Sequence, residues 1–249
     1  MRTRLQAAIA QWPSWPIPLS GPPERIGPLS GRTNHNARLS APGLDHDLVL
    51  RLHHPDSGLL GIDRSTERKA TQAAAEAGLG RPALHWNSSH DYALFPYIEA
   101  RTWTSADLNK PSQRRRLRQV IDRLMPLRLA SPRRQYAAYL QSYVDELNRR
   151  QSLTTELHDR WLRFKPELHE WDRTDWPVGL VHHDLIPANV LDTGERLMLI
   201  DFEYAAMGHA DIDRWAIDPD QVIEPIVARL INWTNRLWEA LVEHSLADS

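Results

Sequence analysis

The sequence predicts an α+β protein in which a small antiparallel β region precedes a larger, mostly helical region. Up to residue 98, short apolar segments alternate with turns rich in Pro, Gly and Asn, which is typical of strands. From Ser105 onward, apolar residues recur at helical spacing. The chain has 249 residues, of which 41% are hydrophobic and 25% charged, enough to bury one large core or two smaller ones.

The first region begins with a proline-rich segment, residues 12–28, whose prolines prevent a regular helix and predict an extended lead-in. Two pairs of strands are expected in this region, at residues 36–40, 47–52, 83–86 and 92–98. The first pair is joined by a turn at Pro42-Gly43 and the second by a polar turn. An Ala-rich helix over 63–77, which ends at Gly78, separates the two pairs.

The second region contains four segments with helical periodicity, at residues 111–129, 132–150, 153–171 and 221–244. Two short apolar segments, 179–182 and 196–200, interrupt the helices and predict a small β element. No internal repeat is visible.

The charge balance excludes several classes of protein. With 30 Lys+Arg and 32 Asp+Glu, the net charge of -2 argues against a nucleic-acid partner and against a polybasic membrane protein. The chain has no Cys, which excludes disulfides, thiolate metal sites and a cysteine nucleophile. No apolar run is long enough for a membrane helix, and the N-terminal residues do not resemble a signal peptide. We therefore expect a cytoplasmic protein; the composition does not indicate an oligomeric state.

Residues 181–191 carry the most informative motif. His182, Asp184 and Asn189 match the catalytic-loop pattern H-x-D-x-x-x-x-N of kinases. An apolar strand then delivers Asp201, at the place where such enzymes keep a Mg²⁺-binding aspartate. Two motifs in the right order predict phosphoryl transfer.

The chemistry of phosphoryl transfer accounts for these residue types. A carboxylate within reach of the acceptor hydroxyl, Asp184, orients and deprotonates it. Oxygen ligands from Asn189 and Asp201 suit Mg²⁺, and His182 would brace the loop by hydrogen bonds. The alternative is that His182 and His183 are ordinary loop residues and Asp184 a helix cap. A metal site built on the two histidines is disfavoured because adjacent residues project in different directions.

On these motifs, residues 26–216 resemble the aminoglycoside phosphotransferase and choline kinase superfamily of small-molecule kinases, which has a two-lobed, protein-kinase-like fold. The resemblance implies a nucleotide-binding lobe over 1–99 and a catalytic and substrate-binding lobe over 100–249. It also implies ATP and Mg²⁺ as cofactors and a small-molecule alcohol as substrate.

In the small lobe, the segment 29–36 looks like the nucleotide loop of the family, with Ser30, Gly31, Thr33 and Asn34 as its binding positions. Arg51 stands where many members carry Lys, a substitution that resembles the choline and thiamine kinase side of the family. Arginine retains the charge and can contact two phosphate oxygens. Glu67 matches the residue that orients this cation; alternatively it is a solvated carboxylate on a helix face.

The segment 95–103 is similar to the hinge between the lobes, in which Tyr97 and Ile98 would hold the edge of adenine. Leu191 would pack below the ring, or is a plain core leucine. The chain departs from the family pattern where His183 and Ala100 replace glycines. After the metal-binding aspartate, Asp213 matches the family better than Asp211, which could cap a helix instead.

The acceptor is the least determined part of the prediction. Aromatic faces next to carboxylates suit a cationic alcohol such as choline, ethanolamine or thiamine, and Trp215, Glu203 and Asp211 are the candidate substrate residues. Most of the ten Trp can equally be core anchors. An aminoglycoside or sugar acceptor remains an alternative. In another class of function, the Arg-rich stretch 114–134 would make the protein a non-catalytic binding module, although its spacing is that of a solvated helix face.

Overall fold

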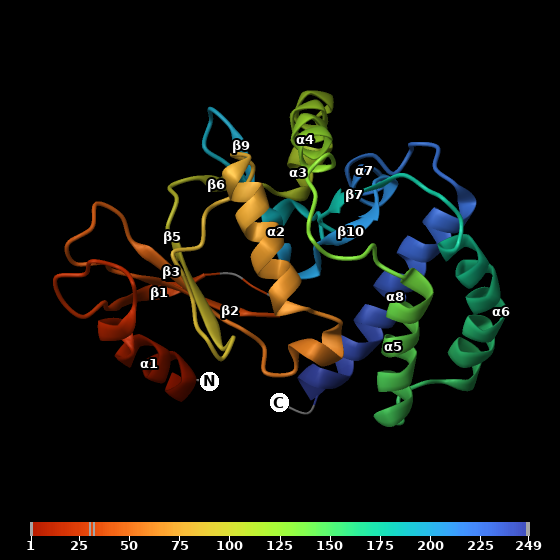
Figure 1. Cartoon of the computed structure of the whole chain (residues 1–249), viewed down its shortest axis with the longest axis horizontal. Helices are drawn as coiled ribbons and strands as arrows, with labels where there is room; N and C mark the ends of the chain where they lie inside the picture. Colours follow the sequence, from red (N-terminus) through yellow and green to blue (C-terminus); the bar gives the residue numbers. More distant parts are fainter. Residues whose placement is uncertain (1, 30, 32, 248–249) are drawn as a thin grey trace.

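The computed structural model, which describes residues 2–29, 31 and 33–247, confirms the α+β prediction (Figure 1). A five-stranded antiparallel sheet with the order β1-β2-β3-β5-β4 forms the N-terminal region, and helices form most of the rest. In Figure 1 the sheet lies on the left, the helices α5, α6 and α8 lie on the right, and α2 lies between them. A lobe boundary after residue 99 stays a prediction.

The sheet contains both predicted strand pairs. Its strands are β1 (Arg25–Leu29), β2 (His35–Leu39), β3 (Leu48–Leu52), β4 (His85–Trp86) and β5 (Tyr92–Pro96). The central strand β3 is buried along its whole length. Because side chains alternate along a strand, Leu48, Leu50 and Leu52 face one hydrophobic core while Val49 and Arg51 point to the opposite side. This alternation directs a cation towards the helical region.

Two elements near the N-terminus were not predicted. The helix α1 (Arg2–Ala10) contributes Ala8 to the core on the outer face of the sheet, and the following Trp15 donates a hydrogen bond of 2.9 Å to the Tyr92 hydroxyl. β1 begins inside the segment 12–28, which was expected to be an extended lead-in and not a strand of the sheet. Gly27 and Pro28 are tolerated in β1 because it is an edge strand, where a missing backbone donor costs little.

The helix α2 (Arg64–Glu76) connects the two regions. Asp63 begins it by accepting a hydrogen bond of 2.9 Å from the Ser65 amide, and its buried face includes Glu67, Ala70 and Ala74. After α2, Gly80 forms a parallel bridge with Leu199, so the loop that follows the helix is fixed to the helical region.

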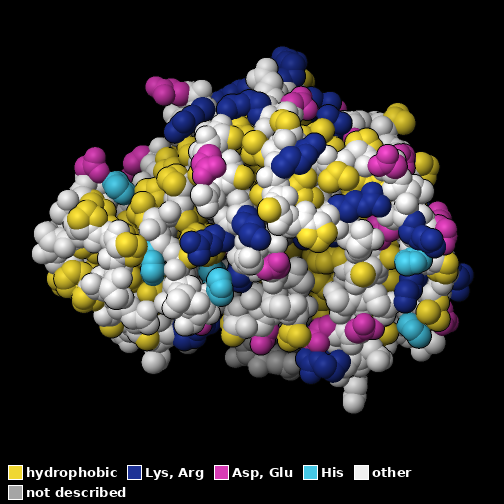
Figure 2. All heavy atoms as spheres, viewed as in Figure 1, with side chains coloured by type: hydrophobic (Ala, Val, Ile, Leu, Met, Phe, Trp, Pro, Cys, Tyr) yellow, Lys and Arg dark blue, Asp and Glu magenta, His cyan; other side chains and the backbone are white. Residues whose placement is uncertain are grey.

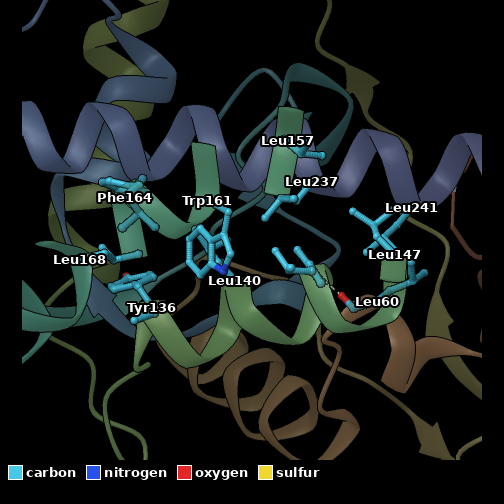
Figure 3. Close-up of a cluster of buried hydrophobic side chains, with 14 of the residues drawn as sticks. Leu60, Tyr136, Leu140, Leu147, Leu157, Trp161, Phe164, Leu168, Leu237 and Leu241 are labelled. Atoms are coloured by element: carbon cyan, nitrogen blue, oxygen red, sulfur yellow. Dashed lines mark hydrogen bonds between the residues drawn. The ribbon is translucent and has the colours of Figure 1, made fainter. Parts of the chain in front are cut away.

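The helical region confirms the four predicted helices, with shifted ends. Its helices are α3 (Ser105–Leu108), α4 (Pro111–Leu124), α5 (Tyr136–Arg149), α6 (Thr155–Asp172), α7 (Asp211–Ile217) and α8 (Pro225–Ala247). Side chains of α5, α6 and α8 enclose the largest aromatic residue of the core, Trp161, together with Leu140 and Leu237 (Figure 3). Helix α6 continues through Pro166, a residue that usually interrupts a helix.

Two small sheets hold the segment that carries the motifs. β7 (Val178–Val181) pairs with β10 (Ala206–His209), and β8 (Val190–Asp192) lies between β6 (Arg101–Thr102) and β9 (Leu197–Leu199). β10 was not predicted because it is short and contains Gly208. The motif residues 182–189 therefore span the gap between β7 and β8, and Asp201 follows β9 directly. Among the described residues, every helix is too short or too polar to span a bilayer.

Candidate active site

A cavity of about 650 Å³ lies between the β-sheet and the helical region. It collects side chains from β3, the segment after β5, the motif segment and the helices α5 and α8. Ten of the residues singled out from the sequence line it, namely Gly31, Thr33, Arg51, Tyr97, Ile98, Asp184, Asn189, Leu191, Asp201 and Glu203. Ser30 lies outside the described residues, and Asn34, Glu67 and His182 are buried behind the cavity wall.

The segment before Asp184 is held from below by Asp213 of α7. The Asp213 carboxylate accepts hydrogen bonds from the amides of His182, at 2.7 Å, and His183, at 3.0 Å. Burial raises the pKa of the Asp213 carboxyl, while the two amides and His182 act in the opposite direction. The His182 ring is fully buried and Nε2 lies 2.9 Å from the Ile200 carbonyl oxygen. His182 therefore braces the loop, as expected. The sequence favoured Asp213 over Asp211 as the match to the family, and in the structure it is Asp213 that holds the loop.

His183 shows why a glycine is common at its position. Its φ of 63° is in the left-handed region, which residues with a Cβ seldom adopt. Two contacts of the ring accompany this conformation: Nδ1 lies 3.1 Å from the Val181 carbonyl oxygen, and Nε2 lies 3.0 Å from the Tyr136 hydroxyl. Burial lowers the pKa of His183 well below its ordinary value, so the ring is neutral. The left-handed turn precedes Asp184, whose side chain lines the cavity.

Asp184, Asn189 and Asp201 line the same cavity. The Asn189 carboxamide nitrogen donates to the Asp184 carbonyl oxygen, at 2.9 Å, and to its carboxylate, at 3.0 Å. Asp201 has a φ of 66° and its carboxylate, which is 25% exposed, accepts a hydrogen bond from Arg51. Because the amide nitrogen of Asn189 is used internally, the oxygen atoms of Asn189 and Asp201 are the groups that can face a cation.

Arg51 is the centre of a buried charge network. Its guanidinium contacts Glu67 at 2.8 Å and Glu203 at 3.1 Å, in addition to Asp201. Glu67 also contacts Arg64 at 2.6 Å, and its side chain is 0% exposed, so the alternative of a solvated carboxylate is wrong. A buried guanidinium that is paired with carboxylates stays charged, and the pKa of Arg51 is raised by its acidic neighbours, against the lowering effect of burial.

Glu203 occupies the inner end of this network, together with Asn34. Asn34 donates a hydrogen bond of 2.7 Å to the Glu203 carboxylate, and its own carboxamide oxygen accepts from the His54 amide at 3.2 Å. Burial, and then the negative charge of Asp201, raise the pKa of Glu203 to about 7. Asn34 thus supports the base of the loop rather than lining the cavity.

On the sheet side, the cavity has the features of a site for a flat ring. Val49 and Leu191 line it from opposite elements, β3 and β8. The Tyr97 amide already donates to the Asp47 carbonyl at 2.7 Å, so a ring at this edge would meet the backbone of the next residue, Ile98. A Cβ added to Gly31 would lie 2.7 Å from the Asn36 side chain, so this loop position requires glycine.

The opposite side of the cavity is aromatic. It is lined by Tyr136, Tyr139 and Tyr143 of α5, by Tyr204 of the short helix η4 (Phe202–Tyr204), and by Trp238 of α8. The Trp238 indole donates a hydrogen bond of 2.7 Å to the Tyr204 hydroxyl, and the hydroxyls of Tyr139 and Tyr143 are hydrogen-bonded to each other. Burial raises the pKa of all four tyrosines, so each remains a neutral phenol. No motif of the sequence pointed to this wall.

A family model described as the phosphotransferase enzyme family matches residues 25–243. The chain belongs to this family. The match confirms the superfamily identified from the motifs, and it makes the protein a small-molecule phosphotransferase. A comparison with curated protein sequences finds no match.

Solved structures of phosphotransferases share the fold. A choline/ethanolamine kinase family protein from Mesorhizobium loti is 22% identical, with a TM-score of 0.68, and the match covers 97% of this chain and 87% of the other. LicA in complex with AMP is 15% identical, with a TM-score of 0.72 over 96% and 90% of the two chains. Spectinomycin phosphotransferase in complex with ADP and spectinomycin is 10% identical, with a TM-score of 0.60 over 95% and 86%. The expected two-lobed, kinase-like fold is confirmed.

Within this phosphotransferase, two of the residues singled out for the acceptor do not line the cavity. Asp211 and Trp215 lie on α7, and the cavity is lined from that helix by Ile212. The Asp211 carboxylate instead contacts Arg214 at 3.4 Å. The prediction failed because position along the chain indicated proximity to Asp201, whereas α7 uses its buried residue Asp213 to support the motif segment.

The Arg-rich helix α4 uses its arginines within the phosphotransferase chain. Arg116 pairs with Asp192 at 2.8 Å and Arg118 with Asp218 at 3.1 Å, while Arg114 and Arg123 donate to backbone carbonyls. Figure 2 shows Lys and Arg side chains at the top of the molecule, over α4, among acidic and uncharged groups. The structure therefore gives the binding-module alternative no specific support.

Proposed function

We propose that this phosphotransferase moves the γ-phosphoryl group of ATP, with Mg²⁺, to the hydroxyl of a small cationic alcohol of the choline, ethanolamine or thiamine class. The observation that carries the proposal is the division of the cavity. Asp184 lines it together with two dissimilar sets of residues: the polar and charged groups Arg51, Asn189 and Asp201, and the aromatic wall of α5, η4 and α8.

The residues present fit a magnesium ion. Asn189 and Asp201 offer only oxygen ligands, and Mg²⁺ is commonly bound by one or two side chains together with phosphate oxygens and water. Bound Mg²⁺ would neutralise the charge of the β- and γ-phosphates.

Asp184 and Arg51 would act directly on the reacting groups. The Asp184 carboxylate, fixed on one side by the Asn189 amide at 3.0 Å, accepts the proton of the acceptor hydroxyl and directs its oxygen at the γ-phosphorus. When a nucleotide binds, its phosphate oxygens would replace some of the carboxylates that contact Arg51. The guanidinium would then donate hydrogen bonds to the phosphates. Both roles require the fixed positions that the buried network provides.

The aromatic wall supports a cationic acceptor. Five aromatic rings face a cavity that also holds the carboxylates of Asp184 and Glu203, and a ring face attracts a cation by about 0.5–2 kcal/mol. The guanidinium of Arg134 also lines the cavity, but it is held against the Tyr139 ring, 4.2 Å from the centroid, and donates to the Tyr204 carbonyl. The likeness to choline/ethanolamine kinase family structures agrees with this choice of acceptor.

The test is Mg²⁺-dependent release of ADP from ATP in the presence of choline, ethanolamine, thiamine, simple sugars and aminoglycosides. We expect stimulation by one cationic alcohol and loss of roughly 10²–10⁴-fold in kcat for Asp184→Asn, as is typical when a positioned base is removed. Asp211→Asn is the matched control, because this carboxylate lies two residues from Asp213 but outside the cavity, and we expect it to retain activity.

Three outcomes would contradict the proposal in different ways. If only sugars or aminoglycosides stimulated ADP release, the proposed acceptor class would be wrong and the proposed phosphoryl transfer would stand. Full activity of Asp184→Asn would remove the assigned base. ATP-independent binding of RNA, anionic lipid or an acidic protein, retained in Asp184→Asn and without any turnover, would favour the binding module.

A further inference from the structure

Arg81 is a cation that lines the cavity and forms no ion pair with any of the described residues. It follows Gly80 in the loop between α2 and β4, and it lines the cavity together with Arg51 and Asp201. In the part of the chain that the structure describes, its guanidinium makes no hydrogen bond and no ion pair. Arg51, by contrast, has three carboxylate partners.

The position of Arg81 is fixed by its neighbours. The guanidinium carbon lies 4.4 Å from the centroid of the Phe95 ring. Phe95 is paired with Val49 across β5 and β3, and Val49 lies on the same side of β3 as Arg51. The backbone before Arg81 is anchored as well, because the Leu199 amide donates to the Leu79 carbonyl at 2.7 Å. Arg81 therefore stands on the cavity side of the sheet, between the ring site and the metal-binding residues.

Among the described residues, the charge of Arg81 is offset only at a distance, by Asp201. Burial and the positive charge of Arg51 lower the pKa of the guanidinium to about 9, while Asp201 acts in the opposite direction, so the group remains a cation at neutral pH. Arg81 is half-buried, and removing a cation from water without a directly paired anion is unfavourable. An anionic ligand in the cavity would supply the missing partner.

The nucleotide supplies such an anion, and two described residues of the loop at 29–36, Gly31 and Thr33, line the cavity with Arg81. Asn34 of that loop is turned to Glu203, and Gly31 is the glycine that lines the cavity. Arginine is well suited to phosphate because its planar fork can donate two parallel hydrogen bonds.

We propose that Arg81 is a second phosphate-binding residue of the nucleotide site, whose guanidinium donates hydrogen bonds to oxygens of the α- and β-phosphates. This inference rests on the proposed use of ATP. Arg51 approaches the phosphates from β3 and Arg81 from the loop after α2, so the phosphate chain is held by two cations from separate elements.

The test measures the affinities of ATP, ADP and adenosine by isothermal titration calorimetry for the wild-type protein, Arg81→Met and Arg81→Lys. We expect Arg81→Met to weaken ATP and ADP binding about 10- to 100-fold and to leave adenosine within about 2-fold, since a phosphate contact to a charged group is lost. The affinity of Arg81→Lys for ATP and ADP should lie between those of the wild type and of Arg81→Met, because lysine keeps the charge but lacks the planar fork of the guanidinium. Arg68→Met is the matched control, as Arg68 is exposed on α2 and does not line the cavity.

The results separate failure of this inference from failure of the proposed function. If wild-type protein binds neither ATP nor ADP, both are wrong. If the wild type binds them and Arg81→Met binds them equally well, only the phosphate contact is wrong. If Arg81→Met weakened adenosine binding as much as ATP binding, Arg81 would contact the adenosine part of the nucleotide, and the inference would be wrong. Should Arg81→Met fail to fold, as judged by its melting curve, Arg81→Lys alone decides: unchanged ADP affinity would contradict a bidentate contact.

Discussion

The two sides of the cavity differ in how their residues are held. On the phosphate side, Arg51, Glu67 and Glu203 come from a strand, a helix and a short helix and are joined in one buried network. On the acceptor side, the aromatic residues come from α5, η4 and α8 and pack as part of the core, with hydroxyl and indole groups paired to each other. One side is built from ion pairs, the other from packed rings.

This difference predicts unequal tolerance to substitution. Removing one member of a buried charge network leaves its partners unpaired, which costs about 3–5 kcal/mol. Exchanging one aromatic side chain of the acceptor wall for another apolar one changes the shape of the site and costs less. Under the proposed function, we therefore expect the phosphate side to determine the reaction and the aromatic side to determine the choice of acceptor.

Among the changes that compare the two sides of the cavity, the largest effect is expected for Arg51→Met. This change removes the cation that contacts Glu67, Asp201 and Glu203 and that would neutralise phosphate oxygens in the transition state. We expect kcat/KM for ATP to fall by roughly 10²–10³-fold. This is the size of effect seen when an enzyme loses one hydrogen-bond donor that stabilises the charge of a transition state. Steady-state kinetics with varied ATP measures it.

The control for Arg51→Met is Arg51→Lys, which keeps the charge at the same place. We expect it to recover most of the activity, because lysine still serves as a point charge for phosphate. If Arg51→Met and Arg51→Lys were equally inactive while both remained folded at the assay temperature, the guanidinium shape and not its charge would matter. Wild-type activity in Arg51→Met would contradict the role assigned to the phosphate side.

The second prediction concerns Gly208, which lies where the two sides meet. A Cβ at Gly208 would overlap the Tyr136 hydroxyl and lie 2.7 Å from the His183 ring. Gly208→Ala should therefore push apart the aromatic wall and the residue before Asp184. We expect kcat to fall about 10- to 100-fold, since displacement of a reacting group by about 1 Å has an effect of this size.

Gly27→Ala is the matched control for Gly208→Ala, because nothing lies within 4 Å of a Cβ at Gly27. We expect its kcat to equal that of the wild type. A Gly208→Ala protein with unchanged kcat and unchanged acceptor KM would show that the contact of Tyr136 with His183 does not position Asp184.

The comparison of the two sides also explains how much of the site the sequence predicted. Asp184, Asn189 and Asp201 have a fixed spacing because they stand at the ends of short strands, and chain distance there sets spatial distance. Arg51 and Glu67 were identified from the resemblance to the family, because their contact joins a strand to a helix and no local spacing marks it. The hairpins and the long helices were predicted because their periodicity reflects a buried face.

The aromatic wall and Arg81 were not predicted, because tertiary packing brings them to the cavity. Tyr136, Tyr139 and Tyr143 do repeat at the spacing of one helix face, a signal that is shared by any core helix. Trp238 enters from α8, far along the chain from η4, and no local pattern marks it. Trp215 was chosen for its nearness in sequence to Asp201, and the orientation of α7 excludes it.

The smallest effect, and the sharpest test of the acceptor side, is expected for Trp238→Leu. This change removes one ring face of the cavity and the hydrogen bond to Tyr204. A cation–ring contact of about 0.5–2 kcal/mol corresponds to a factor of about 2–30 in affinity. We expect KM for the cationic alcohol to rise by this factor while KM for ATP stays unchanged, as measured with each substrate varied in turn.

Trp233→Leu separates an acceptor contact from a general loss of packing. Trp233 lies one turn earlier on α8 and stacks on Phe164, with ring centroids 5.9 Å apart, and it does not line the cavity. Its replacement should lower the melting temperature and leave KM for the alcohol unchanged. If both tryptophan variants raised KM for the alcohol equally, the effect would come from α8 as a whole. The aromatic side would then share the rigidity of the phosphate side, and acceptor choice could not be altered without loss of the reaction.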